Sequence, residues 1–127
     1  MAIVTPAVMR GLQPSLDDAA RDVQMVLRKA RADAVTQARG VAVWLDVASL
    51  DYGLEGGLTE TLPEAFTAEA KVAAVETRAT RAAIRFFPDG SSTGGHFRLG
   101  YEGAHVDIDV DWLTGRVSLA PAEGGGR

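Results

Sequence analysis

The residues best suited to catalysis or metal binding lie in one stretch, from His105 to Asp111. If this stretch is a strand, its side chains alternate between two faces, and four polar groups share one face: His105, Asp107, Asp109 and Asp111. Carboxylate oxygens are the ligands that hard cations such as Ca²⁺ prefer. The stretch lacks the glycine-turned loop that wraps a calcium ion, and neighbouring carboxylates on one strand face stand about 7 Å apart. We therefore interpret the row as the polar face of a half-buried strand.

Other catalytic arrangements are not evident. His96 and His105 are the only histidines, and neither belongs to a His-x-His or His-Glu-x-x-His spacing. The glycine-rich segment 89–95 lacks the lysine of a phosphate-binding loop and leads into a predicted strand, so we interpret it as a turn. We expect no catalytic residue, no metal ligand, no cofactor and no small-molecule substrate.

Composition excludes further classes of protein. The 127 residues are 46% hydrophobic and 24% charged, which is typical of one folded domain. The net charge is −4, and the acidic excess lies after residue 50. A protein that binds a nucleic-acid backbone needs clustered lysines and arginines instead, so we expect no nucleic-acid partner. The absence of cysteine excludes disulfides, thiolate zinc sites and iron–sulfur clusters.

A long amphipathic helix is predicted over residues 15–39. Ser15 is a good N-cap, and Asp17 and Asp18 suit the positive end of a helix. Gly40 is expected to end the helix. The apolar positions form one continuous stripe: Leu16, Ala20, Val23, Leu27, Ala30, Ala34 and Ala38.

After residue 40 the hydrophobic period changes from helical to two, which indicates strands. We predict strands at 41–48, 71–77, 82–87, 96–101, 105–112 and 116–120, and a long irregular loop at 49–70 with room for short strands. One long helix followed by short strands indicates an α+β fold, in which the helix packs on one side of an antiparallel sheet or sandwich.

The ends of the chain are predicted to differ from this domain, which we assign to residues 15–120. Residues 1–14 begin with an uncharged apolar stretch, and two interpretations remain open: a frayed terminus that packs on the domain, or the residual tail of a longer hydrophobic segment. No run of about 18 apolar residues, the length that spans a bilayer, is present. Residues 121–127 are expected to form a flexible glycine-rich tail.

Two turn segments resemble the H-type minor pseudopilins of bacterial type II secretion systems, the GspH/FimT-like family. The family has a Phe-x-Pro-x-Gly-Ser-Ser-x-Gly-Gly turn between two strands and a Thr-Gly-Arg-Val turn before the last strand. The matching residues are Phe87, Pro88, Asp89, Gly90, Ser91, Ser92, Gly94, Gly95, Thr114, Gly115 and Arg116. The segment from Leu16 to Arg39 is also similar to the family's helix, so the resemblance covers about residues 15–120.

This resemblance implies a pilin-like fold and a non-enzymatic subunit of a short periplasmic fibre. It also implies partners, namely the major and other minor pseudopilins, and a position near the fibre tip. Family precursors carry a Gly-Phe-Thr-Leu-x-Glu processing site and about 20 apolar residues that anchor them in the inner membrane. Neither is present in these 127 residues, which agrees with the second interpretation of residues 1–14.

Two surfaces are candidates for partner contact. The first is the predicted loop 49–70, where apolar side chains on irregular backbone suit recognition: Tyr52, Leu54, Leu58 and Phe66. The opposite interpretation, that they fold back into the core, remains open. The second is the charged face of the helix, with Arg21, Arg28 and Arg31, which suits a neighbouring acidic subunit.

Three alternatives compete with this reading. A FimT-like minor pilin of type IV pili, some of which are associated with DNA uptake, is the nearest, although the acidic second half argues against DNA binding. A small metal-dependent or hydrolytic domain would use the row from His105 to Asp111. A carbohydrate-binding sandwich would use Trp44 and Trp112.

Overall fold

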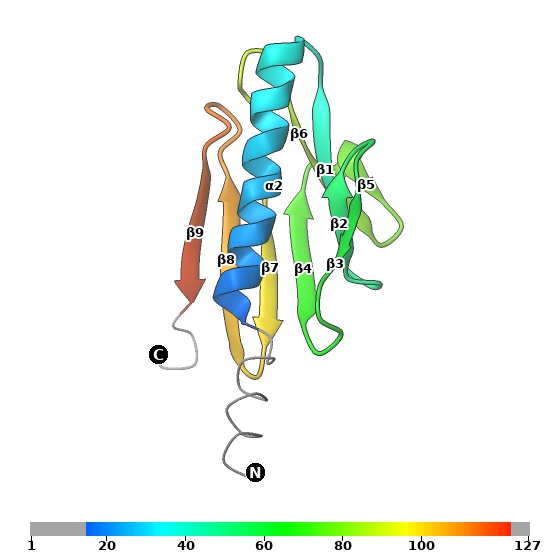
Figure 1. Cartoon of the computed structure of the whole chain (residues 1–127), viewed down its shortest axis with the longest axis vertical. Coiled ribbons are helices and arrows are strands. Elements are labelled where there is room, and N and C mark those ends of the chain that lie inside the picture. Colours follow the sequence, from blue (N-terminus) through cyan, green and yellow to red (C-terminus); the bar gives the residue numbers. More distant parts are fainter. Residues whose placement is uncertain (1–14, 123–127) are drawn as a thin grey trace, which may run out of the picture.

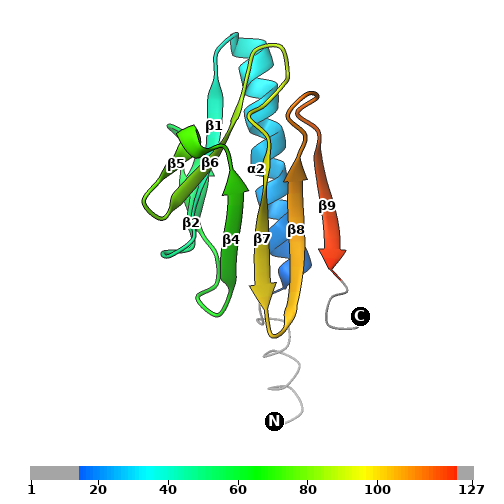
Figure 2. The same ribbon diagram turned by 180° about the vertical axis from the view of Figure 1, so that it is seen from behind.

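The computed structural model describes residues 15–122, and of these the side chains of residues 15–120. One long helix, α2, lies lengthwise over one face of two antiparallel sheets (Figure 1). Seen from behind, the sheets lie in front and the helix is behind them (Figure 2). The predicted α+β fold, with a helix on antiparallel sheets, is therefore confirmed. Within the described residues, no helix is both long enough and apolar enough to cross a bilayer.

Helix α2 (Leu16–Gln37) begins and ends close to the predicted bounds. The Ser15 hydroxyl accepts a hydrogen bond from the Asp18 amide at 3.3 Å, which is the predicted N-cap. The predicted stop at Gly40 is wrong, because Ala38 takes the left-handed conformation (φ 55°) and its amide bonds to the Ala34 carbonyl. The helix therefore ends at Gln37, two residues before the predicted end at residue 39, and the left-handed conformation of Ala38 costs some backbone strain.

The five-stranded sheet contains the first strand after the helix. In spatial order its strands are β3 (Thr59–Thr61), β2 (Asp51–Leu54), β1 (Val41–Asp46), β6 (Arg81–Phe86) and β5 (Thr77–Arg78). Strands β1 and β6 pair over their full length, from Val41 opposite Phe86 to Asp46 opposite Arg81.

The four-stranded sheet contains the C-terminal half of the domain. Its order is β4 (Thr67–Val72), β7 (Gly95–Tyr101), β8 (Ala104–Val110) and β9 (Val117–Ala122). Strand β9 runs two residues into the segment predicted as a flexible tail, while residues 123–127 and the predicted segment 1–14 lie outside the described residues.

The region between residues 49 and 78 differs most from expectation. The predicted loop 49–70 contains strands β2 and β3 and most of β4. The predicted strand 71–77 is wrong: β4 ends at Val72, a 3-10 turn follows (Ala74–Glu76), and Thr77 begins β5. The chain leaves one sheet here and enters the other, so one continuous strand cannot form.

The core lies between α2 and both sheets. The predicted stripe is buried at Ala20, Val23, Leu27, Ala30 and Ala34. Opposite it lie apolar side chains of β1, β6, β7 and β8: Val41, Val43, Leu45, Ile84, Phe86, Phe97, Leu99, Val106, Ile108 and Val110. The helix thus holds the two sheets together, and it fixes the positions of the turns that connect their strands.

Candidate functional site

The two glycine-containing turns singled out in the sequence meet in space. One connects β6 to β7 (residues 87–94) and the other connects β8 to β9 (residues 111–116). The Ser92 amide donates to the Trp112 carbonyl at 2.8 Å, and the Ser92 hydroxyl donates to the Asp111 carbonyl at 3.0 Å. Ser92 is buried, so these bonds join the turns from the inside. We call residues 87–94 and 111–116 together the paired turns.

Each turn is stabilised by an aspartate at its start. The Asp89 carboxylate accepts from the hydroxyl and the amide of Ser91, at 2.6 and 2.9 Å. The Asp111 carboxylate accepts from the hydroxyl and the amide of Thr114, at 2.7 and 3.2 Å. These hydrogen bonds lower the pKa of both carboxyl groups, and the bond from the hydroxyl has the larger effect in each case.

Arg31 of helix α2 fastens both turns to the helix. Its Nε–H donates to the Gly90 carbonyl and to the Thr114 carbonyl, each at 3.0 Å. Arg31 therefore contacts residues 59 and 83 positions away in the chain. Arg31, which was predicted to contact a partner, thus has an intramolecular role through its Nε–H.

Two glycines make this close approach possible. Gly115 has φ +71° and is buried, and a Cβ there would overlap the Gly90 carbonyl oxygen. Gly94 has φ +76°, and a Cβ there would come within 2.9 Å of the Trp112 Cβ. The glycine positions of the family turns are therefore required by contact as well as by backbone conformation.

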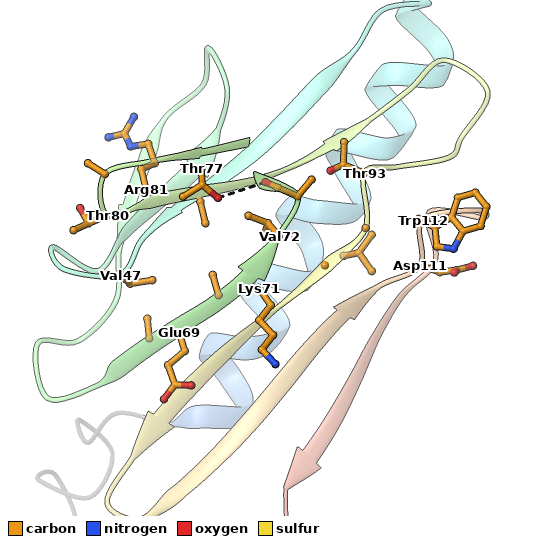
Figure 3. Close-up of a pocket in the computed structure, with 18 residues that line it drawn as sticks. Val47, Glu69, Lys71, Val72, Thr77, Thr80, Arg81, Thr93, Asp111 and Trp112 are labelled. Carbon is orange, nitrogen blue, oxygen red and sulfur yellow. Dashed lines mark hydrogen bonds between the residues drawn. The ribbon is translucent and has the colours of Figure 1, made fainter. Parts of the chain in front are cut away.

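A groove of about 890 Å³ runs from the paired turns along the gap between the two sheets. Figure 3 shows Trp112 and Asp111 at one end of it, Glu69 and Lys71 on the β4 side, and Arg81 on the side of β6. The Thr77 hydroxyl donates to the Ala73 carbonyl at 3.4 Å in the connection between the sheets. Trp112 is 64% exposed and the adjacent Leu113 is 62% exposed, so the turn presents two large apolar side chains to solvent. Such exposure is a mark of a contact surface.

Sequence reasoning missed Leu113 as a surface candidate, and it considered Trp112 only for a carbohydrate-binding surface and not for contact with a partner protein. The signal that was available is their position between Asp111 and Gly115, inside a turn and not in a strand. Trp112 had been counted as the end of a strand predicted at 105–112, whereas β8 ends at Val110.

The four apolar residues predicted to be exposed between positions 49 and 70 have different environments. Tyr52 and Phe66 are buried, so for these two candidates the alternative interpretation, that they fold back into the core, is confirmed, and Phe66 packs against Tyr101 with ring centroids 5.3 Å apart. Burial raises the pKa of Tyr52 to about 12. Leu54 is partly buried against the core, and Leu58 is exposed. Of this set, Leu58 is available to a partner.

The three predicted arginines of the helix all lie on its exposed side. Arg28 and Arg31 line a second groove, between α2 and β9, together with Arg116. Arg21 is not among the residues that line it. Arg28 and Arg31 therefore share a groove to which Arg21 does not belong.

His105, Asp107 and Asp109 lie on the polar face of strand β8, as interpreted, but Asp111 does not, because β8 ends at Val110 and Asp111 begins the turn. Val106, Ile108 and Val110 are buried, while the Asp107 carboxylate pairs in bidentate fashion with Arg98 of β7, at 2.7 and 3.0 Å. This hydrogen bond lowers the pKa of Asp107. The His96 Nδ1 lies 4.0 Å from Asp109. In the part of the chain that the structure describes, no group of three histidine or acidic side chains is arranged to hold a metal ion.

The segment 90–94 also has the Gly-x-Ser-x-Gly spacing of hydrolase nucleophiles, with Ser92 at its centre. The turn leads into strand β7, whereas a hydrolase elbow leads into a helix. The Ser92 hydroxyl is occupied by the Asp111 carbonyl and the Gly94 amide, the latter at 2.9 Å. The geometry gives Ser92 a role in turn packing.

The two tryptophans lie apart in the fold. Trp44 is on β1, and the Arg81 guanidinium stacks 3.8 Å from the centre of its ring. Trp112 is on the turn after β8. Trp44 thus belongs to the five-stranded sheet and Trp112 to a turn beside the four-stranded sheet, and the two rings do not pair with each other among the described residues.

Comparison with known proteins gives consistent matches. A family model described as "Type II transport protein GspH" matches residues 19–115. The Type II secretion system protein H of Xanthomonas campestris pv. campestris is 32% identical over 107 residues, which are 84% of this chain and 63% of that protein. The chain thus spans less than two thirds of that relative's length.

Solved structures share the fold. The minor pseudopilin EpsH of the type 2 secretion system of Vibrio cholerae superposes with a TM-score of 0.67 at 13% identity, over 84% of this chain and 96% of that one. The type IV minor pilin FimU of Pseudomonas aeruginosa superposes with a TM-score of 0.64 at 18% identity, over 84% and 88% of the two chains. At these identities the similarity concerns the fold alone.

Proposed function

The chain belongs to the GspH family of minor pseudopilins of type II secretion, and from that premise we propose that it is a non-enzymatic subunit of the pseudopilus near the fibre tip. In this role it contacts the major and other minor pseudopilins and supports export of folded proteins across the outer membrane. The full-length protein is held in the inner membrane by an N-terminal hydrophobic helix, with the domain in the periplasm. The mechanism is recognition by shape and charge, without covalent chemistry or a nucleic-acid partner.

One observation carries the partner-binding part of this proposal: the paired turns hold Trp112 and Leu113 exposed on a fixed backbone. Arg31 and Ser92 fix that backbone through five hydrogen bonds to or from the turns. A large apolar side chain on an ordered backbone loses little conformational entropy on binding, which favours it as an interface anchor. Leu58, exposed on the β2–β3 connection, is a second contact that we propose.

The test uses the full-length gene in a strain that lacks it. The wild-type gene is expected to restore secretion, and Trp112→Ala with Leu113→Ala is expected to reduce both secretion and cross-linking to other pseudopilins at unchanged protein level. Leu58→Ala tests the second proposed contact separately, and Met25→Ala is the control, because Met25 is 66% exposed, as Trp112 is at 64%, and lies outside both proposed contacts. Thermal unfolding of the variants checks that the fold persists.

Failure of the wild-type gene to restore secretion would refute the role in type II secretion. Restoration by the double variant, at the wild-type level, would instead remove the paired turns as a contact surface. A loss confined to Leu58→Ala would transfer the contact to the β2–β3 connection.

A further inference from the structure

The groove between helix α2 and the outer strand β9 differs from the rest of the surface in its charge. It has a volume of about 860 Å³ and runs beside the helix from Gln24 to Ala32. Its charged residues are Arg28, Arg31, Arg116 and Asp111, and Val117, Ser118 and Leu119 of β9 form its other wall. Three guanidinium groups thus gather in one groove of a chain whose net charge is −4. We call it the arginine groove.

The one carboxylate in the arginine groove is already engaged. Asp111 Oδ2 accepts hydrogen bonds from the hydroxyl and the amide of Thr114, at 2.7 and 3.2 Å. Within residues 15–122, no carboxylate lies within ion-pair distance of Arg28, Arg31 or Arg116. The nearby Lys29 does pair, with Asp33 at 3.2 Å, and neither residue lines the groove. With three guanidinium groups and one carboxylate, the arginine groove therefore has a net positive charge.

Arg31 gives the arginine groove a fixed donor. A guanidinium carries five N–H groups, and only the Nε–H of Arg31 is used in its two carbonyl contacts. Nη2 lies so close to Gly90 that a Cβ there would meet it at 2.7 Å. The fork is thus held in place before any ligand arrives, which lowers the entropic cost of binding a carboxylate.

We propose that the arginine groove binds an extended, carboxylate-rich segment of a neighbouring fibre subunit, an inference that rests on the function proposed above. The eight-residue rise from Gln24 to Ala32 is about 12 Å, the length of about four residues of extended chain, so an extended peptide fits better than a single anion. Gln24 and Ser118 offer neutral hydrogen-bonding groups beside the arginines. Nucleic acid is disfavoured, because the acidic remainder of the chain repels a long polyanion.

The first test measures binding of a hexaglutamate peptide to the 127-residue chain by calorimetry and by amide chemical shifts. We expect binding that weakens with salt, with shifts at Arg28, Arg31, Gly115 and Ser118, and no binding of hexaglutamine. Arg28→Gln and Arg116→Gln are each expected to weaken the binding about fivefold. The matched control is Arg78→Gln, an exposed arginine on β5 outside the arginine groove, which is expected to leave the affinity unchanged.

Four outcomes of this test overturn the proposal. The first two are absence of hexaglutamate binding, and an equal loss of affinity for hexaglutamate in Arg78→Gln and Arg28→Gln. The third is that inorganic phosphate, at the same concentration as the peptide, saturates the shifts of the same amides. The fourth is that a DNA oligonucleotide binds more tightly than hexaglutamate. Sedimentation of the chain alone addresses a second copy as the occupant: self-association that Arg28→Gln abolishes would contradict a different subunit as the partner.

The second test separates this inference from the proposed function. In the strain that lacks the gene, the full-length Arg28→Glu, Arg116→Glu variant is expected to reduce secretion at least tenfold, and a glutamate-to-lysine change in another pseudopilin is expected to restore it. If the wild-type gene restores secretion and the reversed variant does so equally, the arginine groove is not a subunit contact. If the wild-type gene itself fails, the proposed function falls together with the fibre subunit as the occupant, and the peptide measurements then decide only whether the arginine groove binds a carboxylate-rich chain.

Discussion

At the scale of single residues, Arg31 has the most specific role in this fold. Replacing it with alanine removes the Nε–H contacts to the Gly90 and Thr114 carbonyls. Because the side chain is largely exposed, we expect Arg31→Ala to lower the free energy of unfolding by only about 1–2 kcal/mol. Urea denaturation at neutral pH measures this change through the midpoint, with the m-value unchanged.

Arg28→Ala is the matched control, since Arg28 lies one helical turn earlier and its side chain makes no hydrogen bond to another described residue. It is expected to change the free energy of unfolding by less than about 0.5 kcal/mol. Arg31→Lys is expected to recover only part of the loss, because an ammonium cannot reproduce the directed Nε–H donor. Equal stabilities for the two alanine variants would show that Arg31 does not hold the turns.

Gly115 allows a second prediction, which separates backbone conformation from close packing. Gly115→Ala meets both a positive φ of +71° and an overlap with the Gly90 carbonyl, so we expect a loss of about 2–4 kcal/mol. Gly103→Ala is the control: its φ is +82°, but nothing lies within 4 Å of the added Cβ, so only the backbone cost of about 1 kcal/mol is expected. If thermal or urea unfolding gives the same loss for both, the close approach of the turns does not contribute.

The turn residues themselves could be predicted from the sequence, because Pro88, Asp89 and Gly90 have local conformational preferences that define a turn. Their association with Arg31 could not, since it depends on a tertiary contact between segments 59 and 83 residues apart. The same limit applies to Tyr52 and Phe66. Tyr52 lies between Asp51 and Gly53, and Phe66 lies between Ala65 and Thr67, so no large apolar neighbour marks either residue, and only the fold places them in the core.

At the scale of elements, helix α2 is the part that joins both sheets. Leu27 is fully buried at its centre, so Leu27→Ala is expected to cost about 2–5 kcal/mol through lost burial and the cavity left behind. Met25→Ala, on the exposed side of the same helix, is expected to change stability by less than about 0.5 kcal/mol. Urea midpoints measure both, and a small effect at Leu27 would contradict the packing of the helix on the sheets.

The helix and the later strands were predictable for the same physical reason: each has a clear hydrophobic period over its length. Strand β8, for example, alternates buried Val106, Ile108 and Val110 with polar residues. Strands β2 and β3 are only four and three residues long, too short for a period to emerge. Strand β4 does alternate, but its inward positions are Ala68, Ala70 and Val72, and two alanines are a weak hydrophobic signal.

At the scale of the whole molecule, acid stability depends on carboxyl groups whose pKa is lower in the folded state than in the unfolded chain. The pKa of Asp107 is lowered chiefly by its hydrogen bonds from Arg98. The pKa of Asp46 is lowered chiefly by a hydrogen bond from the Ser49 amide, and those of Asp89 and Asp111 chiefly by hydrogen bonds from the hydroxyls of Ser91 and Thr114. A depressed folded pKa means that the ionised group stabilises the fold above the unfolded pKa, about 3.9, and that this contribution disappears as the pH falls through the folded pKa.

The free energy of unfolding is therefore expected to be nearly constant with respect to these groups between pH 7 and 5, and to fall below about pH 4. Asp107→Asn removes one of the contributions, so the variant should be less stable than wild type at pH 7, and the difference should shrink by pH 2.5. Asp109→Asn is the control, because Asp109 lies on the same strand without an arginine partner among the described residues. Urea unfolding at several pH values measures the slopes. A wild-type slope that persists in Asp107→Asn would show that the pair with Arg98 does not link stability to pH, and the acid sensitivity would then reside in Asp46, Asp89 and Asp111.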